Sequence, residues 1–148
     1  MKRKHLYALA ASLLIALAAC LFAIFFFLSA LDWEGPEGDL RAYNLPSYIR
    51  NVPRVEVVVD TVSYRSTFMD GGSPGLDCIS YRSNATPEAL RQVMESYLRA
   101  LHFQPVPPPE TVGGPGFTDY YNNGSSDVWV KLWAEKERTD VQVCHFYY

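Results

Sequence analysis

The longest apolar run in the chain extends from Leu6 to Leu31 and contains no charged residue. A helix that crosses a bilayer needs about 20 apolar residues, whereas the apolar core of a removed signal peptide has about 7–15. The run therefore predicts a retained transmembrane helix over residues 6–31, which acts as a signal anchor in the lipid bilayer. Basic residues in the tail, residues 1–5, precede the run and acidic residues follow it. The positive-inside rule then places the tail in the cytoplasm and the C-terminal part outside, as a single-pass protein of the cell membrane.

A second interpretation of the same segment rests on Cys20, which follows the tripeptide Leu17-Ala18-Ala19. This tetrapeptide is similar to the lipobox of bacterial lipoproteins, in which the cysteine carries the lipid. In such lipoproteins a polar tether normally follows the cysteine, but here the apolar run continues beyond it. We expect Cys20 to be a small apolar side chain within the helix, with lipidation at Cys20 as the alternative.

Beyond the apolar run, the pattern predicts one small extracytoplasmic domain. Residues 32–50 are interrupted by glycine and proline and are expected to be a tether; residues 51–148 form the domain. A helix is expected over residues 87–101, because Thr86 is a good N-cap, Pro87 suits the first helical position and apolar residues recur at helical spacing. Apolar positions predict strands at residues 54–64, 76–82, 117–121, 128–134 and 141–147. The expected fold is α+β, an antiparallel sheet in the order β-β-α-β-β-β with the helix packed on one face.

Alternation divides the last two predicted strands into two faces. One face carries the valines and leucines that suit the helix. A solvated opposite face normally alternates to polar residues, but here it carries Trp129, Lys131, Trp133, Phe146 and Tyr148. Because exposed apolar patches of this size tend to be contact sites, we expect a binding surface for a protein partner in the cell envelope. The alternative is that residues 43–49, or the proline-rich connector at 104–116, cover this face as part of the core.

The same alternation places Cys78 and Cys144 on one face. Outside the cytoplasm, two cysteines in a small domain favour a disulfide. It would close a loop of about 65 residues and stabilise the domain by on the order of 4 kcal/mol in the chain-entropy account. Two separate buried thiols, or a metal site that combines His145 with Cys144, are the alternatives. No metal is expected, because C-x-x-C spacing is missing and the two histidines of the domain, His102 and His145, are far apart in sequence.

Charge and motifs narrow the function further. The residues after the apolar run contain ten basic and sixteen acidic side chains, so nucleic acid, which binds to basic patches, is a poor candidate partner. The sequence has no phosphate loop and no G-x-S-x-G or H-E-x-x-H motif, and His102 suits a capping role at the helix end. We therefore expect a membrane-anchored binding or accessory module of an envelope complex, without a cofactor. A small extracytoplasmic hydrolase that uses carboxylates or His145 is the alternative.

Overall fold

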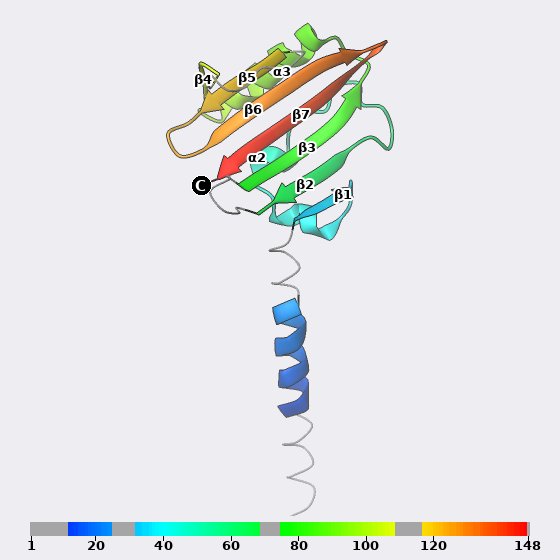
Figure 1. Ribbon diagram of the computed structural model, residues 1–148, viewed down its shortest axis with the longest axis vertical. Helices are drawn as coiled ribbons and strands as arrows, with labels where there is room; N and C mark the ends of the chain where they lie inside the picture. Colours follow the sequence, from blue (N-terminus) through cyan, green and yellow to red (C-terminus); the bar gives the residue numbers. More distant parts are fainter. Residues whose placement is uncertain (1–11, 25–31, 69–74, 109–116, 148) are drawn as a thin grey trace, which may run out of the picture. The chain divides into compact units, whose positions relative to one another are not determined.

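The computed structural model describes residues 12–24, 32–68, 75–108 and 117–147. The chain divides into two compact units, residues 1–31 and residues 32–148. In the first unit, residues 12–24 are helical and their side chains are exposed. All strands of the described residues belong to the second unit (Figure 1).

The prediction that the fold includes a transmembrane helix over residues 6–31 is wrong. A crossing helix needs about 20 residues, and no helix in the described part of the chain is long and apolar enough to cross a membrane. The helix at residues 12–24 is the described part of this segment. The remainder of the predicted span, residues 6–11 and 25–31, lies outside the described residues.

The second unit is built on a seven-stranded antiparallel sheet in the spatial order β1-β2-β3-β7-β6-β5-β4 (Figure 1). The strand order predicted from the sequence, with five strands, is therefore wrong. Two short strands that were not predicted form the two edges of the sheet: one precedes the predicted strands along the chain, and the other follows the helix. The strands are β1 (Trp33–Pro36), β2 (Ser63–Thr67), β3 (Gly75–Ser83), β4 (Gln104–Val106), β5 (Phe117–Asn122), β6 (Asp127–Glu135) and β7 (Arg138–Tyr147).

The composition and short length of both edge strands prevented their prediction from the sequence. Each contains a proline, Pro36 in β1 and Pro105 in β4, and they are 4 and 3 residues long. Strands of this kind have no apolar alternation to reveal them, and they are defined by hydrogen bonds to a single neighbour. Short length and proline are also common ways of protecting a sheet edge from pairing with another chain.

The strand predicted over residues 54–64 is wrong for most of its length, because the observed strand, β2, begins at Ser63. The valine-rich residues before it form a loop that we call the β2 loop, residues 54–62. This loop runs beside the end of β3, where Val57 and Ser83 form an isolated bridge. Its backbone reverses at Glu56 and Asp60, with φ angles of 46° and 60°. Positive φ is uncommon for residues other than glycine, so the alternating valines gave no sign of these reversals.

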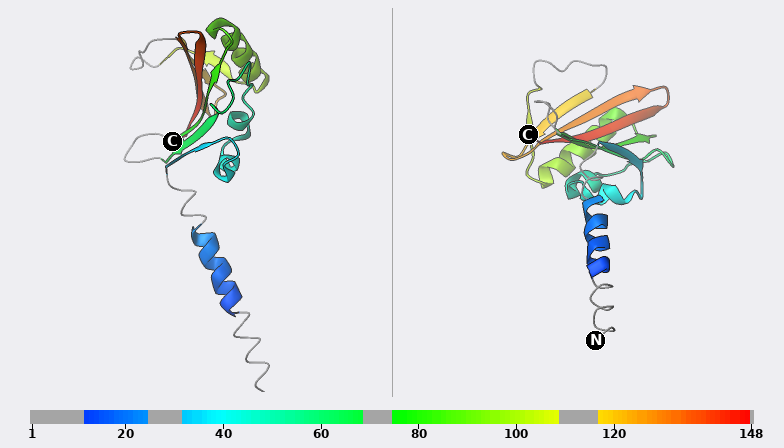
Figure 2. Two further views of the ribbon diagram at one scale, coloured as in Figure 1. Left: turned by 90° about the vertical axis from the view of Figure 1, so that its right-hand side faces the viewer. Right: turned by 60° about the horizontal axis from the view of Figure 1, so that its bottom comes forward.

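Three helices lie together on one side of the sheet (Figure 2). They are the 3-10 helix η1 (Leu40–Asn44), α2 (Ser47–Arg50) and α3 (Pro87–Ala100). Residues 32–50, expected to be a tether, are part of this domain, because Trp33, Leu45 and Ile49 are buried in its core. The core lies between these helices and the inner side of the sheet, where Val128, Val130, Leu132, Val141 and Val143 are buried.

Helix α3 follows its sequence signals closely. The Thr86 hydroxyl accepts a hydrogen bond from Ala89 N at 3.3 Å, and the apolar stripe buries Leu90, Met94 and Leu98. At the other end, Phe103 N donates to Leu98 O at 3.0 Å and His102 N to Arg99 O at 3.0 Å. His102 has a φ of 66°, the left-handed position that glycine usually takes after a helix. The backbone of His102 therefore ends the helix.

Candidate binding surface

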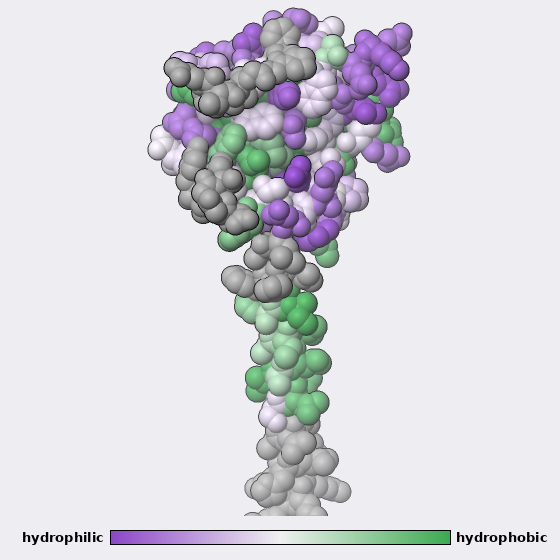
Figure 3. Space-filling view, viewed as in Figure 1, coloured by the Kyte–Doolittle hydropathy of each residue, from purple (hydrophilic) through white to green (hydrophobic). Residues whose placement is uncertain are grey.

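We call the side of the sheet opposite the three helices the open face. Cross-strand partners in an antiparallel sheet point to the same face, and the register aligns Trp129 with Cys144 and Cys144 with Cys78. Along β6 these residues alternate with the buried valines of the core. Figure 3 looks onto this face: hydrophobic and weakly polar residues occupy its middle, and hydrophilic residues gather toward the β6–β7 hairpin.

Four of the five residues predicted for the binding surface lie on the open face. Trp129, Lys131, Trp133 and Phe146 are each half-buried there, and Tyr148 lies outside the described residues. They form two groups. The rings of Trp129 and Phe146 have centroids 6.3 Å apart, whereas Lys131 Nζ lies 5.4 Å from the centroid of the Trp133 ring.

The first group extends onto β3, where Leu76 is the cross-strand partner of Phe146. We call Trp129, Phe146 and Leu76 the aromatic cluster. Residues 43–49 do not cover it, because Leu45 and Ile49 are buried in the core on the helix side. Of the proline-rich connector, residues 104–106 form the edge strand β4, and residues 109–116 lie outside the described residues.

The predicted disulfide between Cys78 and Cys144 is confirmed. The two cysteines are direct partners across β3 and β7, with Cα atoms 4.1 Å apart, near the roughly 4.5 Å of the closer type of antiparallel pair. Although both lie on the open face, Cys78 is only 3% and Cys144 0% exposed. The bridge therefore joins two central strands and is shielded from solvent beside the aromatic cluster.

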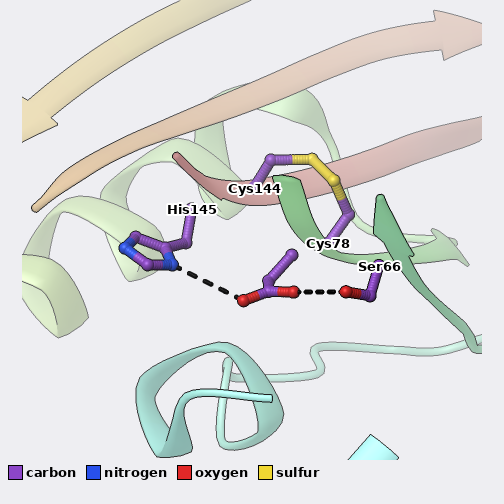
Figure 4. The surroundings of a disulfide bond; sticks show 5 residues. Ser66, Cys78, Cys144 and His145 are labelled. Atoms are coloured by element: carbon purple, nitrogen blue, oxygen red, sulfur yellow. Dashed lines mark hydrogen bonds and ion pairs between the residues drawn. A yellow bond between two sulfur atoms is a disulfide. The ribbon is translucent and has the colours of Figure 1, made fainter. Parts of the chain in front are cut away.

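His145 points to the other side of the sheet, toward α2, and is 9% exposed (Figure 4). It cannot share a metal with Cys144, because neighbouring residues of one strand face opposite ways and Cys144 is bonded to Cys78. Among the described residues, no group of three His, Cys, Asp or Glu side chains is placed to hold a metal ion.

A polar cluster surrounds His145. The Ser66 hydroxyl donates to Asp77 Oδ1 at 2.8 Å, and Asp77 Oδ2 lies 3.7 Å from His145 Nδ1. This nitrogen has no hydrogen-bond partner among the described residues. Because the carboxylate lies between hydroxyl and imidazole, the serine is not bonded to the base that would have to activate it as a nucleophile. The Tyr48 ring packs edge-on against the imidazole at 5.4 Å, which fixes His145 within the core.

A hollow of about 460 Å³ lies at the second group, beside Trp133. The β2 loop forms one wall, where Arg82 N donates to Thr61 Oγ1 at 3.1 Å. Arg82 and Asp140 also line the hollow, with Arg82 Nε and Asp140 Oδ1 3.0 Å apart. A second hollow of about 450 Å³, at the β6–β7 hairpin, shares Arg82 and Asp140 with the first. The polar side chains and the ring that line the first hollow are Asp60, Thr61, Ser80, Arg82, Trp133, Asp140 and Gln142.

Sequence reasoning missed this hollow. Alternation correctly placed Trp133 and Gln142 on the open face, and the register adds Ser80, which aligns with Gln142. Asp60 could not be assigned to it, because the residue was expected inside a strand. Its contribution depends on the long-range pairing of the β2 loop with β3, for which the sequence carries no local signal.

Comparisons of the chain with protein-family models, with curated proteins and with solved structures give no significant match. The fold and the surface by themselves define a small disulfide-linked antiparallel α+β domain. Its helices cover one side of the sheet, and aromatic side chains occupy the other.

Proposed function

We propose that residues 32–148 form a non-catalytic binding module that uses the aromatic cluster to bind a protein partner in the cell envelope. The observation that carries the proposal is the half-buried pair Trp129 and Phe146 on the face that no described helix covers. A solvated sheet face normally carries polar side chains at such positions. Large aromatic side chains supply much of the binding energy at the centre of protein interfaces.

The two edge strands are poorly suited to bind a partner, which favours contact through a face of the sheet. A partner that adds a strand needs a free row of backbone N–H and C=O groups. Here both edge strands are short, and each contains a proline that has no N–H to donate. The two edges are therefore poor sites for a stable contact, which favours contact through the open face.

The disulfide favours binding because it keeps this face rigid. Cys78 and Cys144 join β3 to β7, the strands that carry Leu76 and Phe146 of the aromatic cluster. A surface held in its bound form loses less conformational entropy on association, so more of the contact energy remains as affinity. The bridge is well suited to hold the cluster ready for its partner.

The proposed site of action is outside the cytoplasm. Disulfides persist in oxidising compartments and are rare in the cytosol, and Cys78–Cys144 is a buried bridge. We further propose that the apolar segment, residues 6–31, binds the lipid bilayer and keeps the module close to it. Lipidation at Cys20, an exposed free cysteine, stays the alternative means of attachment.

Quantitative co-purification tests this proposal. The tagged full-length chain, expressed at its native level, should recover one protein in a fixed ratio, and Trp129→Ala and Phe146→Ala should each abolish the recovery. Two matched controls remove exposed apolar side chains elsewhere: Tyr43→Ala and Val59→Ser, at positions 68% and 80% exposed. Equal recovery with all four variants, each shown to be folded, would refute the aromatic cluster as the binding site.

A further inference from the structure

We propose that the hollow beside Trp133 is a second binding site, and that it takes a neutral oligosaccharide. The site shares no residue with the aromatic cluster, so it goes beyond the proposed protein contact and does not depend on it. Its hollow of about 460 Å³ is within the range of about 300–1,000 Å³ that small-molecule sites occupy. It adjoins the second hollow, of about 450 Å³, at Arg82 and Asp140, and together the two hollows form a groove whose volume accommodates more than one sugar ring.

The walls of the groove come from segments far apart in the chain. Its floor is formed by Ser80 and Gln142, which are cross-strand partners in β3 and β7. The β2 loop forms one side and is held by hydrogen bonds to the end of β3, from Val58 N to Arg82 O at 2.9 Å and from Arg82 N to Thr61 Oγ1 at 3.1 Å. Backbone pairing therefore fixes the position of this wall of the hollow.

Unused hydrogen-bonding groups line the floor and one wall. Within the described residues, the side chains of Ser80, Gln142 and Asp60 make no hydrogen bond, although all three line the hollow. A hydroxyl, an amide and a carboxylate together offer both donors and acceptors. Sugar hydroxyls also donate and accept, so this set suits a polyhydroxylated ligand better than one that only donates or only accepts.

Trp133 supplies the apolar part of the site. The face of a pyranose ring that carries axial C–H bonds packs well on an aromatic ring, which presents a flat apolar surface with a polar edge. Lys131 Nζ lies 5.4 Å from the centroid of the Trp133 ring but does not line the hollow. The lysine therefore holds the indole in position without filling the site.

The charges of the lining favour a neutral ligand. Arg82 and Asp140 neutralise each other as an ion pair at 3.0 Å, and Asp60 leaves one carboxylate at the rim. With sixteen acidic against ten basic residues after the apolar run, the domain repels polyanions. A cationic ligand would meet the positive charge of Arg82 in the hollow and that of Lys131 beside the Trp133 ring.

The indole N–H signals in nuclear magnetic resonance test this site directly. The chain has three tryptophans, so the full-length, nitrogen-labelled protein gives three such signals, which single substitutions assign. The protein is prepared in a zwitterionic detergent without a sugar headgroup and titrated into the millimolar range with maltotetraose, cellotetraose and chitotetraose. At least one tetrasaccharide should move the Trp133 signal in a saturable way and leave the Trp33 signal in place.

Variants then tie the binding to the groove. Because Trp133→Ala lacks the reporting indole, its affinity is read from the backbone amide signals of the groove. It should be weaker at least about tenfold, a factor that corresponds to about 1.4 kcal/mol, whereas Trp129→Ala should leave the affinity unchanged. Should Trp133→Ala fail to fold, Gln142→Leu, a change at a half-buried position, should weaken binding while the spectrum stays dispersed. The proposal is overturned if none of the three tetrasaccharides moves the Trp133 signal, or if a folded groove variant binds as tightly as the wild type.

Discussion

Trp129 on β6 is the direct cross-strand partner of Cys144 on β7, and Cys144 is bonded in turn to Cys78 on β3. The indole and the disulfide therefore share one face of three adjacent strands. This relationship links the stability of the domain to its proposed function, because the bond that holds the strands together lies beside the side chains that would meet a partner.

Replacing both bridged cysteines by alanine should lower the free energy of unfolding by about 4 kcal/mol, because the bridge spans 66 positions and restricts the unfolded chain. Urea titration of the full-length protein measures this change. Cys20→Ala is the matched control and should leave the unfolding midpoint in place, because Cys20 lies in the other unit. A double variant as stable as the wild type would show that the disulfide is not a structural support.

Loss of a tryptophan should lower the free energy of unfolding by different amounts on the two sides of the sheet. Trp33 is only 7% exposed, packs within the core and carries the Arg41 guanidinium 5.0 Å from its ring. Trp33→Ala should cost about 3–5 kcal/mol, as large-to-small changes in a core do. Trp129→Ala should cost much less, because its side chain is half-buried on the open face. Equal losses in denaturant titrations would mean that the open face is core.

Much of the central sheet could be predicted from the sequence. The apolar stripe and the Thr86 cap located α3, and alternation located β3, β5, β6 and β7 and correctly assigned Trp129 and Trp133 to the face away from the helix. These features depend on local periodicity, which the sequence displays directly.

The edges and the hollow could not be predicted in the same way. The strand β1 lies among the glycines and prolines of residues 32–50, and its pairing with β2 is a long-range property. Asp60 enters the hollow because the backbone reverses there, with a φ of 60°, at a residue that is not glycine. Only tertiary contacts between the β2 loop and β3 stabilise that reversal, so no local pattern could reveal it.

Buried tyrosines should make the domain sensitive to alkali. Burial raises the pKa of Tyr121 to about 12 and also raises the pKa of Tyr81, whose hydroxyl donates to Pro53 O at 2.8 Å. In the unfolded chain a tyrosine ionises near pH 10. A group whose pKa is raised on folding stabilises the native state fully below its unfolded pKa, and this stability is lost as the pH rises through the folded pKa.

The free energy of unfolding should therefore decrease between about pH 10 and pH 12. Urea midpoints measured across this range test the decrease, and tyrosinate absorbance should show a group of phenols that ionise only as the protein unfolds. Tyr121→Phe should reduce the slope. Midpoints that stay constant up to pH 12 would contradict the role assigned to these side chains.

The proposed location can be tested with a single new cysteine. Gln92 is exposed on α3, so Gln92→Cys in a Cys20→Ala background presents one accessible thiol. A membrane-impermeant maleimide should label this variant in intact cells, since the domain is proposed to lie outside the cytoplasm. Labelling that requires lysis of the cells would contradict that location.

The most direct test of the open face as a binding surface is site-specific photocrosslinking in living cells. A photoreactive residue replaces Thr118, which aligns with Lys131 on the open face, and a second variant carries it at Ser96, exposed on α3. We predict one discrete protein adduct from position 118, none from position 96, and loss of the adduct when Trp129→Ala is added to a chain that remains folded. An adduct that forms from position 96 alone, or one that persists in the folded Trp129→Ala variant, would contradict the account.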